Sequence, residues 1–370
     1  MKNKILFLPF LQIPSGHHQA ATALMDGVKQ IRPEIVCEKI DILSYSYGGI
    51  ERLVSNVYLN WIDALPGLYN AIYKNAVYKN TEKTKRYRLY EILFLSFMKK
   101  LIKKTKPDLI VCTHALPAYM LNYMKKNGDL KTPVINVYTD YFIHRFWGVE
   151  QIDFHFVPSV RMKHFLYQKG VNAEQIYITG IPIHTKIRKQ RQPLALTKQG
   201  VYNVLISGGS LGVGAIWELI QKLAETEPPY PIQFKVLCGK NQQLCARIKA
   251  MQKPHIFPLP YIDCKEEMNH LYEKTDAVIT KPGGVTVSEC LFKRKPIFIY
   301  NALPGQEKIN QQQLTNLGLV YKLEPSDIYG QLFSVLGNIN ELNRYQEQVE
   351  NYHSNLHLIE PHDIIAELLV

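Results

Sequence analysis

One stretch of the chain has residue types and spacing that suit the binding of a phosphate group. Residues 277–280 predict a short apolar strand that ends before Lys281 and the adjacent Gly283 and Gly284. A helix is expected from 285–286 onward, because Gly-Gly ends strands and Ser or Thr caps helices. The free N–H groups and the dipole at a helix start favour an anion, and glycine lets a ligand approach the backbone closely. Lys281 could add positive charge, or it could be an ordinary solvated lysine.

Polar residues that could bind sugar hydroxyls follow. Glu289 is expected in the first or second turn of the helix, where a carboxylate can accept hydrogen bonds from both hydroxyls of a ribose. A further strand, residues 296–300, leads to a loop that contains Gln306 and Glu307. An amide beside a carboxylate offers both donors and acceptors, as a ring of hydroxyls requires. The alternative is a strand, a glycine turn and a helix that bind no ligand.

An earlier pair of glycines predicts a second phosphate-binding turn. Gly208 and Gly209 follow an expected strand at residues 204–207. Backbone amides at this turn could hold a diphosphate together with those at the later helix start. Thr286, at that later helix start, is included among the residues expected to bind the phosphate-bearing ligand.

The pattern K-P-G-G-x-T-x-S-E at 281–289, followed by P-G-Q-E-x-x-N at 304–310, resembles the nucleotide-sugar signature of glycosyltransferase family 28. The likeness is greatest to its bacterial diacylglycerol glucosyltransferases and plant monogalactosyldiacylglycerol synthases, and it extends over about residues 4–350. Other segments in the family's order are Gly16-His17, Tyr138-Thr139-Asp140 with His144 and Trp147, 179–183 and 238–241. The N-terminal loop departs from the family's Gly-x-Gly-His, because it reads Pro-Ser-Gly-His.

The resemblance implies an α/β protein with the GT-B fold, in which two Rossmann-like domains face each other across a cleft. Residues 1–190 would form a domain for the acceptor and the membrane, and 200–350 a domain for the UDP-sugar. Residues 351–370 would form a helical segment that can return to the first domain. The polar, proline-containing stretch 189–200 suits a link between domains.

The alternation of predicted elements independently favours parallel sheets, because short apolar strands alternate with helices throughout the sequence. The expected strands are 4–8, 36–40, 108–112, 134–138, 154–157 and 176–179 in the first half, and 204–207, 234–238, 255–259, 277–280 and 296–300 in the second. Ligands of such sheets bind beyond the carboxyl ends of the strands.

Two residues could take the proton of an attacking hydroxyl. His17 follows the first expected strand, and an imidazole with a near-neutral pKa can act as a base. Asp140 follows the strand at 134–138, and the resemblance gives importance to both positions. We favour Asp140 as the base and His17 as the residue that orients the acceptor or a phosphate. The structural alternatives are a helix-start residue for His17 and the N-cap of a following helix for Asp140. The resemblance also places His144 and Trp147 on the acceptor side, although a core role explains Trp147 equally well.

Composition is that of a folded enzyme with excess positive charge in one half. The 370 residues, of which 46% are hydrophobic and 21% charged, suffice for two domains with their own cores. The net charge is +12, and residues 1–190 carry 27 Lys and Arg against 14 Asp and Glu, whereas 191–370 carry 17 against 18. Six scattered cysteines without C-x-x-C pairs indicate reduced, cytoplasmic usage and no zinc site. No targeting segment and no apolar run of membrane-spanning length is expected.

Much of this positive charge lies in the segment 74–106, which contains eleven Lys and Arg but two Glu. Tyrosine, leucine and phenylalanine at helical spacing give it a broad apolar face. Such a helix can lie among anionic headgroups, where each basic residue contributes about 1 kcal/mol. The alternative is a helix whose apolar face packs on its own domain. Nucleic acid is not expected as a partner, because no nucleic-acid-binding motif accompanies the charge. The lysines expected at the membrane are Lys99, Lys100, Lys103 and Lys104.

These features and the resemblance predict an inverting, metal-independent enzyme that transfers a hexose from a UDP-sugar to diacylglycerol. UDP-glucose is the leading donor by resemblance, and no cofactor is expected beyond this donor substrate. The expected partners are the UDP-sugar, the lipid acceptor and an anionic membrane surface, and the expected location is cytoplasmic with peripheral attachment to the cell membrane. The alternatives are transfer to another lipid, a wall precursor or a small metabolite; a UDP-sugar 2-epimerase of the same fold; and a membrane protein that senses the nucleotide sugar without turnover.

Overall fold

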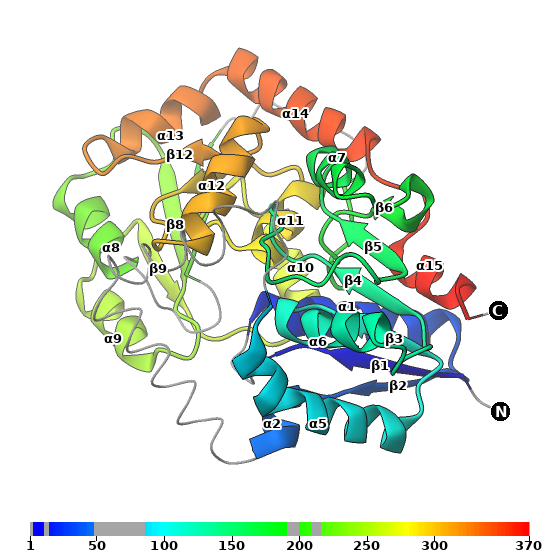
Figure 1. Cartoon of the computed structure of the whole chain (residues 1–370). Coiled ribbons are helices and arrows are strands. Elements are labelled where there is room, and N and C mark those ends of the chain that lie inside the picture. The colour runs from blue at the N-terminus through cyan, green and yellow to red at the C-terminus, as the bar shows by residue number, and fades with distance from the viewer. Residues whose placement is uncertain (1–2, 11–14, 48–85, 191–199, 209–215, 370) are drawn as a thin grey trace. The chain divides into compact units, whose positions relative to one another are not determined.

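A computed structural model of the protein describes residues 3–10, 15–47, 86–190, 200–208 and 216–369. The chain forms two compact units, each with a parallel sheet and helices (Figure 1). The N-terminal unit comprises 1–185, 304–306 and 355–370, and the C-terminal unit comprises 186–303 and 307–354. The basic residues before Arg86, most of the expected link and Gly209 lie outside the described residues.

In the described part of the N-terminal unit, six strands form the sheet: β1 (Lys4–Leu8), β2 (Val36–Lys39), β3 (Leu109–Cys112), β4 (Val134–Val137), β5 (Phe154–Val157) and β6 (Ile176–Ile178). All are parallel, in the order β2-β1-β3-β4-β5-β6. The chain passes from β1 outward to β2 and then returns to the other side of β1, so the strand order reverses between β1 and β3. Ligands of open parallel sheets bind at the carboxyl ends of the strands beside such a reversal.

Helices cover both faces of this sheet. They are α1 (Gly16–Ile31), α2 (Ile42–Tyr47), α5 (Arg88–Thr105), α6 (Ala115–Lys126), α7 (Val160–Gln168), the short 3-10 helix η2 (Ala173–Gln175) and α15 (Pro361–Glu367). Leu6 and Leu8 of β1 pack with α2, α5, α6 and α7, whereas Ile5 and Phe7 pack with α1 and α15. Alternate residues of a strand point to opposite faces, and burial on both faces explains why these strands are apolar throughout.

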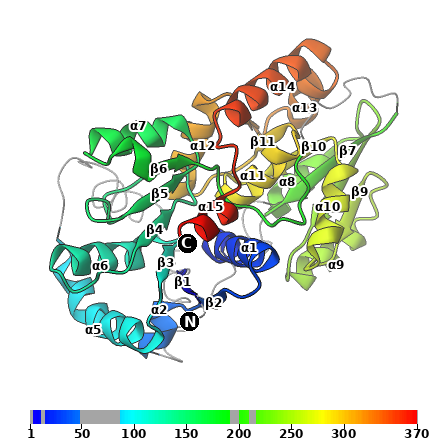
Figure 2. The same ribbon diagram turned by 90° about the vertical axis from the view of Figure 1, so that its right-hand side faces the viewer.

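The last helix belongs to the N-terminal unit although the whole C-terminal unit precedes it in sequence. α15 packs against α1 (Figure 2), and Ile364 and Ile365 are buried in the same core as β1 and β3. Before this helix, the amide of His357 donates to the carbonyl oxygen of Ile178 at 2.7 Å. The end of the chain therefore contributes to the core of the N-terminal unit.

The described residues of the C-terminal unit also form a sheet of six strands: β7 (Tyr202–Ser207), β8 (Ile232–Leu237), β9 (Ile256–Leu259), β10 (Ala277–Thr280), β11 (Ile297–Ile299) and β12 (Tyr321–Lys322). They are parallel, in the order β12-β11-β10-β7-β8-β9. The order reverses between β7 and β10, as in a Rossmann sheet.

The helices of this unit are α8 (Ile216–Glu225), α9 (Gln242–Ala250), α10 (Lys265–Glu273), α11 (Gly284–Phe292), α12 (Gln306–Asn316), α13 (Ile328–Leu336) and α14 (Ile339–Ser354). Val204 and Ile206 of β7 pack with Leu219 and Leu223 of α8 and with Leu332 of α13. Leu219 and Leu223 are four residues apart and so lie on one face of α8, which turns that face to the sheet.

All eleven strands expected from the sequence are present, with ends within two residues of those expected. The parallel α/β fold is thereby confirmed. Among the strands of the described residues, only the two-residue β12 was not predicted, because it is too short to show a pattern. The helix after the paired glycines begins at Gly284, and the expected Ser or Thr side-chain cap is wrong: extended Gly283 (φ −83°, ψ 134°) is the N-cap. Its carbonyl accepts the first helical hydrogen bond, from Val287.

Candidate active site

Loops at the carboxyl ends of β1, β3 and β4 bring polar residues together in the N-terminal unit. These strands are neighbours, so their carboxyl ends meet at one edge beside the reversal of strand order. His17 lies in the first turn of α1 after β1, Thr113 follows β3, and Thr139 and Asp140 follow β4. His17 and Asp140, predicted from the sequence to handle a proton, therefore lie at the same edge.

Two contacts orient the imidazole of His17. Its Nδ1 lies 2.8 Å from the carbonyl oxygen of Thr113 and 2.7 Å from Oγ1 of Thr139. Because a carbonyl oxygen can only accept, Nδ1 carries the proton and donates it to Thr113. In the neutral ring Nε2 then holds the lone pair. Nε2 is therefore the atom of His17 that can take a proton.

The electrostatic surroundings of His17 keep this ring neutral at neutral pH. Burial lowers its pKa below the ordinary value, because the protein interior disfavours the imidazolium. Asp140 and the carbonyl of Thr113 act in the opposite direction, while His18 adds to the lowering. A proton taken up by Nε2 would thus be stabilised by the nearby carboxylate of Asp140, as a general base requires.

Asp140 is 9% exposed and lies in an irregular loop after β4. No helix begins in this described stretch before β5, so the alternative that Asp140 caps a following helix is wrong. The loop is tied to the sheet by Asn136, whose side-chain amide donates to the carbonyl oxygen of Gly148 at 2.7 Å. The position of Asp140 therefore depends on the loop and on β4, not on a helix.

His144 and Trp147, expected on the acceptor side, lie in the same loop. Trp147 is 6% exposed, and its ring centroid lies 4.6 Å from that of Tyr138. This is the setting of a core tryptophan. Nδ1 of His144 accepts from the amide of Phe146 at 3.3 Å. Burial, with a smaller contribution from His17, lowers the pKa of His144 to about 3, so this imidazole is neutral at neutral pH.

Three residues of this edge, Thr113, His114 and Thr139, were not predicted as members of the site. Each follows an expected strand directly or within two residues, and that position is the signal that could have found them. His114 is the N-cap of α6, and its Nδ1 accepts from the amide of Leu116 at 3.1 Å. Its ring centroid lies 4.8 Å from that of His17, with the two planes at 83°. The site thus contains two adjacent imidazoles.

The loops after β7, β10 and β11 carry residues expected to bind the UDP-sugar. These strands are neighbours, and their carboxyl ends form a second candidate edge in the C-terminal unit. Gly208 follows β7, residues 281–283 follow β10, and Glu307 lies in the first turn of α12 after β11. Gln306, the first residue of α12, is grouped with the N-terminal unit.

Gly283 has space beside it that the protein does not use. A Cβ at this position would meet no atom of the described residues within 4 Å. The φ angle of −83° is ordinary for any residue. Neither backbone geometry nor packing therefore requires glycine at the start of α11, whose first turn also contains Thr286. An anion that contacts backbone amides at a helix start needs such space.

Lys281 and Glu307 form an ion pair, with 3.1 Å between Nζ and Oε1. The other carboxylate oxygen of Glu307 accepts from the amide of Leu303 at 2.8 Å. Lys281 is therefore more than a solvated strand-end lysine, because the pair joins the loop after β10 to the loop after β11. The opposite charges also reduce the net positive charge that Lys281 offers to a phosphate.

Glu289 lies in the second turn of α11 and is 6% exposed. The hydroxyl of Tyr272 donates to its Oε2 at 2.8 Å, and Nζ of Lys265 lies 3.9 Å from Oε1. Burial raises the pKa of Glu289, whereas Lys265 and Tyr272 lower it. One carboxylate oxygen is thus held by Tyr272, and Oε1 has only the more distant Lys265 among the described residues.

Comparisons with known proteins match both units. The family model of monogalactosyldiacylglycerol (MGDG) synthase matches residues 17–183, and that of the glycosyltransferase family 28 C-terminal domain matches residues 203–360. An uncharacterized glycosyltransferase of Bacillus subtilis strain 168, YkoN, is 43% identical over 328 residues, which are 89% of this chain and 86% of the relative. The chain belongs to glycosyltransferase family 28. The resemblance seen in the sequence motifs is thereby confirmed.

Two further proteins are similar to this glycosyltransferase over its whole length. The processive diacylglycerol beta-glucosyltransferase of Bacillus cereus strain B4264 is 27% identical over 379 residues, covering 100% of this chain and 94% of the relative. The crystal structure of MurG from Acinetobacter baumannii superposes with a TM-score of 0.61 at 16% identity, covering 99% of both chains. At this low identity the structural likeness shows the fold alone, and the predicted GT-B fold is confirmed.

The described part of the glycosyltransferase's basic segment is α5. Phe94, Met98 and Leu101 of this helix are buried in the core of the N-terminal unit. The alternative of packing on its own domain is therefore correct for this apolar face, because α2 and α6 offer an apolar surface to it. Ile92, near the start of the helix, is 77% exposed. In the described part of the enzyme, no helix is both long and apolar enough to cross a membrane.

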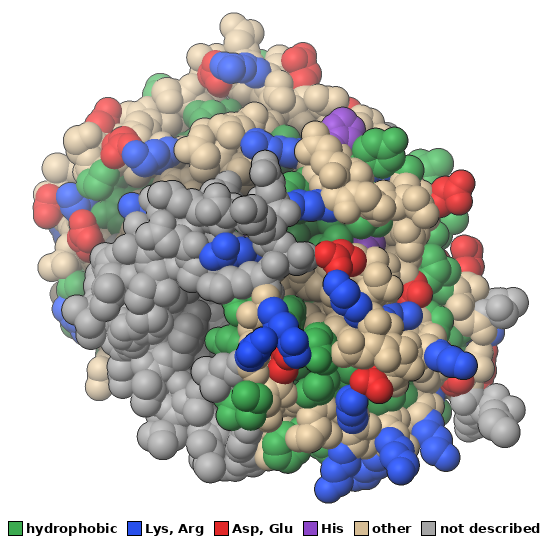
Figure 3. Space-filling model, in the orientation of Figure 1, with side chains coloured by type: hydrophobic (Ala, Val, Ile, Leu, Met, Phe, Trp, Pro, Cys, Tyr) green, Lys and Arg blue, Asp and Glu red, His purple; other side chains and the backbone are tan. Residues whose placement is uncertain are grey.

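The four lysines of α5 are exposed, and Figure 3 shows Lys and Arg side chains gathered along the lower edge of the view, over this helix. Nζ of Lys99 lies 2.7 Å from the carboxylate of Asp129. The basic surface and the exposed apolar residues near the start of α5, which are Tyr90, Ile92 and Leu93, lie on one helix.

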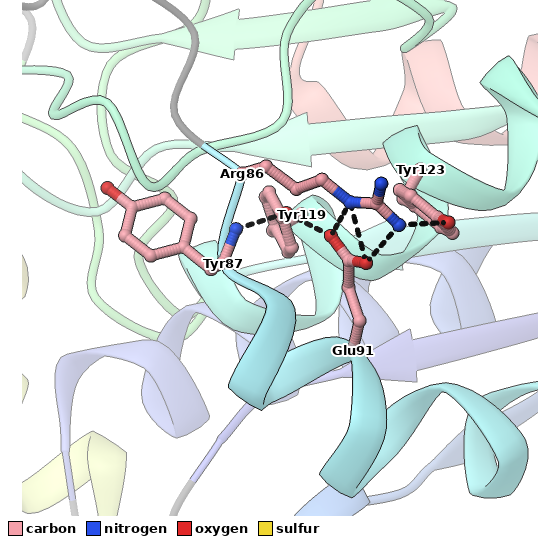
Figure 4. Close-up of polar contacts among 5 residues, drawn as sticks. All are labelled: Arg86, Tyr87, Glu91, Tyr119 and Tyr123. Atoms are coloured by element: carbon pink, nitrogen blue, oxygen red, sulfur yellow. Dashed lines mark hydrogen bonds and ion pairs between the residues drawn. The ribbon is translucent and has the colours of Figure 1, made fainter.

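A polar network fixes the start of α5 against α6 (Figure 4). Arg86 donates to both carboxylate oxygens of Glu91, with 2.9 Å from Nη2 to Oε2, and to the hydroxyl of Tyr123 at 2.9 Å. The hydroxyl of Tyr119 donates to Glu91 at 2.7 Å and accepts from the amide of Tyr87 at 2.8 Å. Burial acts to raise the pKa of Glu91, but these hydrogen bonds bring it below the ordinary value. The carboxylate therefore stays charged and anchors the helix.

Proposed function

We propose that this enzyme transfers a hexose from a UDP-sugar to diacylglycerol, with UDP-glucose as its donor. The observation that carries the proposal is the environment of His17, whose neutral ring offers Nε2 as a proton acceptor beside Asp140. The acceptor is inferred from the relatives, because one whole-chain relative is named a diacylglycerol beta-glucosyltransferase and the N-terminal unit matches the MGDG synthase model. Formation of a β-glucoside from α-linked UDP-glucose requires inversion.

In the proposed reaction His17 takes the proton of the acceptor hydroxyl. The hydroxyl oxygen forms a bond to the anomeric carbon while the bond from that carbon to the β-phosphate oxygen breaks, and the electron pair leaves with UDP. The proton moves to Nε2 of His17, and Asp140 stabilises the imidazolium that results. This assignment reverses the preference derived from the sequence. The reason is that Thr113 holds the Nδ1 proton of His17 and so leaves Nε2 as the basic atom.

The C-terminal unit supplies the donor half of the proposed reaction. Amides around Gly283 and Gly284, at the start of α11, stabilise the negative charge that develops on the departing diphosphate. Glu289 accepts hydrogen bonds from the ribose hydroxyls, and its attachment to Tyr272 orients the carboxylate for this task. Further donor contacts are assigned to Gly208, Gly209, Lys281, Thr286, Gln306 and Glu307.

We also propose that α5 attaches the enzyme peripherally to an anionic membrane on its cytoplasmic side. Each exposed lysine near an anionic surface contributes about 1 kcal/mol of attraction. Exposed Ile92 can enter the headgroup region at the end of the helix where the lysines are absent. Attachment through the N-terminal unit would keep His17 and His144 in the unit that meets the lipid acceptor.

Mass spectrometry of lipids tests this function. Purified protein is incubated with vesicles of phosphatidylglycerol that contain diacylglycerol, and UDP-glucose, UDP-galactose and UDP-N-acetylglucosamine are supplied in turn. A hexosyl-diacylglycerol formed with UDP-glucose is expected, and vesicles without diacylglycerol should give none. Conversion of a UDP-sugar without acceptor would instead indicate a 2-epimerase, and binding without turnover would indicate a sensor.

A further inference from the structure

We propose that His114 donates a hydrogen bond to an ester carbonyl oxygen of the acceptor lipid and so helps to select a diacylglycerol. The inference rests on the proposed function, in which the acceptor is diacylglycerol. His114 follows β3, whose carboxyl end lies beside that of β1. It therefore lies at the same edge of the sheet as His17, but it takes no part in the proposed transfer of the proton.

The hydrogen bond to Leu116 fixes the tautomer of His114. A backbone N–H can only donate, so Nδ1, which lies 3.1 Å from the amide nitrogen of Leu116, is the unprotonated nitrogen. In the neutral ring the proton is then on Nε2. His17 has the opposite arrangement, because its Nδ1 donates and its Nε2 accepts. The two adjacent rings thus offer one donor and one acceptor.

The charge state of His114 is equally well defined. Burial lowers its pKa well below the ordinary value, and the neighbouring imidazoles of His17, His144 and His18 add to this effect. The ring therefore stays neutral where the enzyme works. A neutral N–H donor suits an uncharged oxygen acceptor, whereas a phosphate or carboxylate is usually held by a charged partner.

Packing holds the ring in one orientation. Its centroid lies 4.8 Å from that of Phe10, with planes 31° apart, and 4.8 Å from that of His17, with planes 83° apart. Among the described residues, no group accepts a hydrogen bond from Nε2 of His114. A molecule that brings a hydroxyl to His17 is therefore within reach of this donor as well.

The polar groups of diacylglycerol match this pair of imidazoles. The lipid has one hydroxyl, which can give its proton to Nε2 of His17. Its two ester groups have carbonyl oxygens that only accept, and one ester is attached to the carbon next to the hydroxyl-bearing carbon. An acceptor site for this lipid needs a neutral donor beside the base, and His114 meets that need.

A pair of acceptors that differ only in these carbonyl oxygens tests the proposal. The acceptors are 1,2-dioleoylglycerol and its diether analogue, each in phosphatidylglycerol vesicles with UDP-glucose, and the measured quantity is the ratio of their kcat/KM values. The wild-type enzyme should prefer the diester by about 2- to 10-fold, the range of one neutral hydrogen bond. His114→Asn should lower this ratio to about one. Asparagine still offers Oδ1 to cap α6, because its oxygen takes the place of Nδ1.

His114→Gln is the complementary variant, since its amide can place an N–H near the position of Nε2, and it should restore the preference for the diester. His357→Asn is the matched control, because Nδ1 of His357 also accepts from an amide two residues later, that of Ile359 at 3.2 Å. Its ratio should equal that of the wild type. A wild-type ratio of one, an unchanged ratio in His114→Asn, or an equal loss with both acceptors would overturn the assignment. Wild-type enzyme that glycosylates neither lipid would overturn the proposed function as well.

Discussion

Nδ1 of His17 lies 2.8 Å from the carbonyl oxygen of Thr113, and this contact joins the loops after two neighbouring strands. It determines which nitrogen of the imidazole can act as a base, because the proton on Nδ1 is held by an atom that can only accept. The strands concerned are β1 and β3, between which the strand order of the sheet reverses. The chemistry proposed for this enzyme therefore follows from the topology of its N-terminal sheet.

The pH dependence of activity should report the pKa of His17. The base must be unprotonated, so kcat/KM should rise with pH through this pKa and then level off. Burial lowers the pKa, so the midpoint is expected below the ordinary value of about 6.5. Asp140→Asn removes an interaction that raises the pKa of His17, and the midpoint should move to still lower pH while kcat falls. If kcat/KM of Asp140→Asn no longer falls at low pH, the group that titrates in the wild type is Asp140, and Asp140 is the base.

Substitution of Gly283 by alanine should separate folding from donor binding. The added Cβ meets no atom of the described residues, and the backbone angle is permitted for alanine. Thermal unfolding should therefore show stability that is unchanged or raised by about 0.4–1 kcal/mol, the usual gain from a less flexible unfolded chain. UDP should bind at least tenfold more weakly by calorimetry if a phosphate occupies this space, a loss of about 1.4 kcal/mol. Unchanged affinity would remove Gly283 from the donor site.

Loss of the carboxylate of Glu289 should weaken the binding of UDP. Glu289→Ala is expected to cost about 1–3 kcal/mol of binding free energy, because the ribose hydroxyls lose a buried partner. Tyr272→Phe is the matched control, since it removes the hydroxyl that donates to Glu289 but keeps the carboxylate. Its affinity for UDP should stay within about threefold of wild type. Equal affinities of wild type and Glu289→Ala would mean that the buried carboxylate has a structural role only.

Reversal of charge on α5 should abolish attachment to anionic membranes. The variant replaces Lys99, Lys100, Lys103 and Lys104 by Glu, and sedimentation with phosphatidylglycerol vesicles measures binding. The loss of attraction is about 1 kcal/mol for each lysine removed. The matched control reverses four exposed basic residues of the C-terminal unit, namely Lys249, Lys274, Lys322 and Arg344. Retained sedimentation of the α5 variant, or equal loss in the control, would contradict attachment through this helix.

Much of the fold can be predicted from local sequence, because strands buried on both faces are apolar throughout. Ile5 to Leu8 face two cores in alternation, and such a run is visible without any knowledge of its neighbours. The order of the strands cannot be predicted in this way, since nothing in the residues of β1 shows that β3 will pair with it. His114 was not predicted for this reason: its closeness to His17 depends on that pairing.

The basic segment illustrates a second limit of sequence patterns. Helical spacing correctly predicts that Phe94, Met98 and Leu101 share a face, but a periodic pattern does not say what covers that face. The structure places these side chains in the core with α2 and α6, and leaves Ile92 exposed. The membrane attachment that we propose for α5 therefore relies on fewer apolar residues than the pattern predicts, and more on the lysines.

The formation of hexosyl-diacylglycerol by wild-type enzyme and by His17→Asn is the most direct test of the proposed mechanism. Both proteins are incubated with UDP-glucose and phosphatidylglycerol vesicles that contain diacylglycerol, and the lipids are analysed by mass spectrometry. Asparagine can still donate to the carbonyl of Thr113, but it lacks the basic Nε2. We expect a glycolipid from the wild type, about 10²- to 10⁴-fold slower formation by the variant, and equal affinities for UDP. No glycolipid from wild-type enzyme that binds UDP-glucose, or equal rates for the two proteins, would contradict the proposed mechanism.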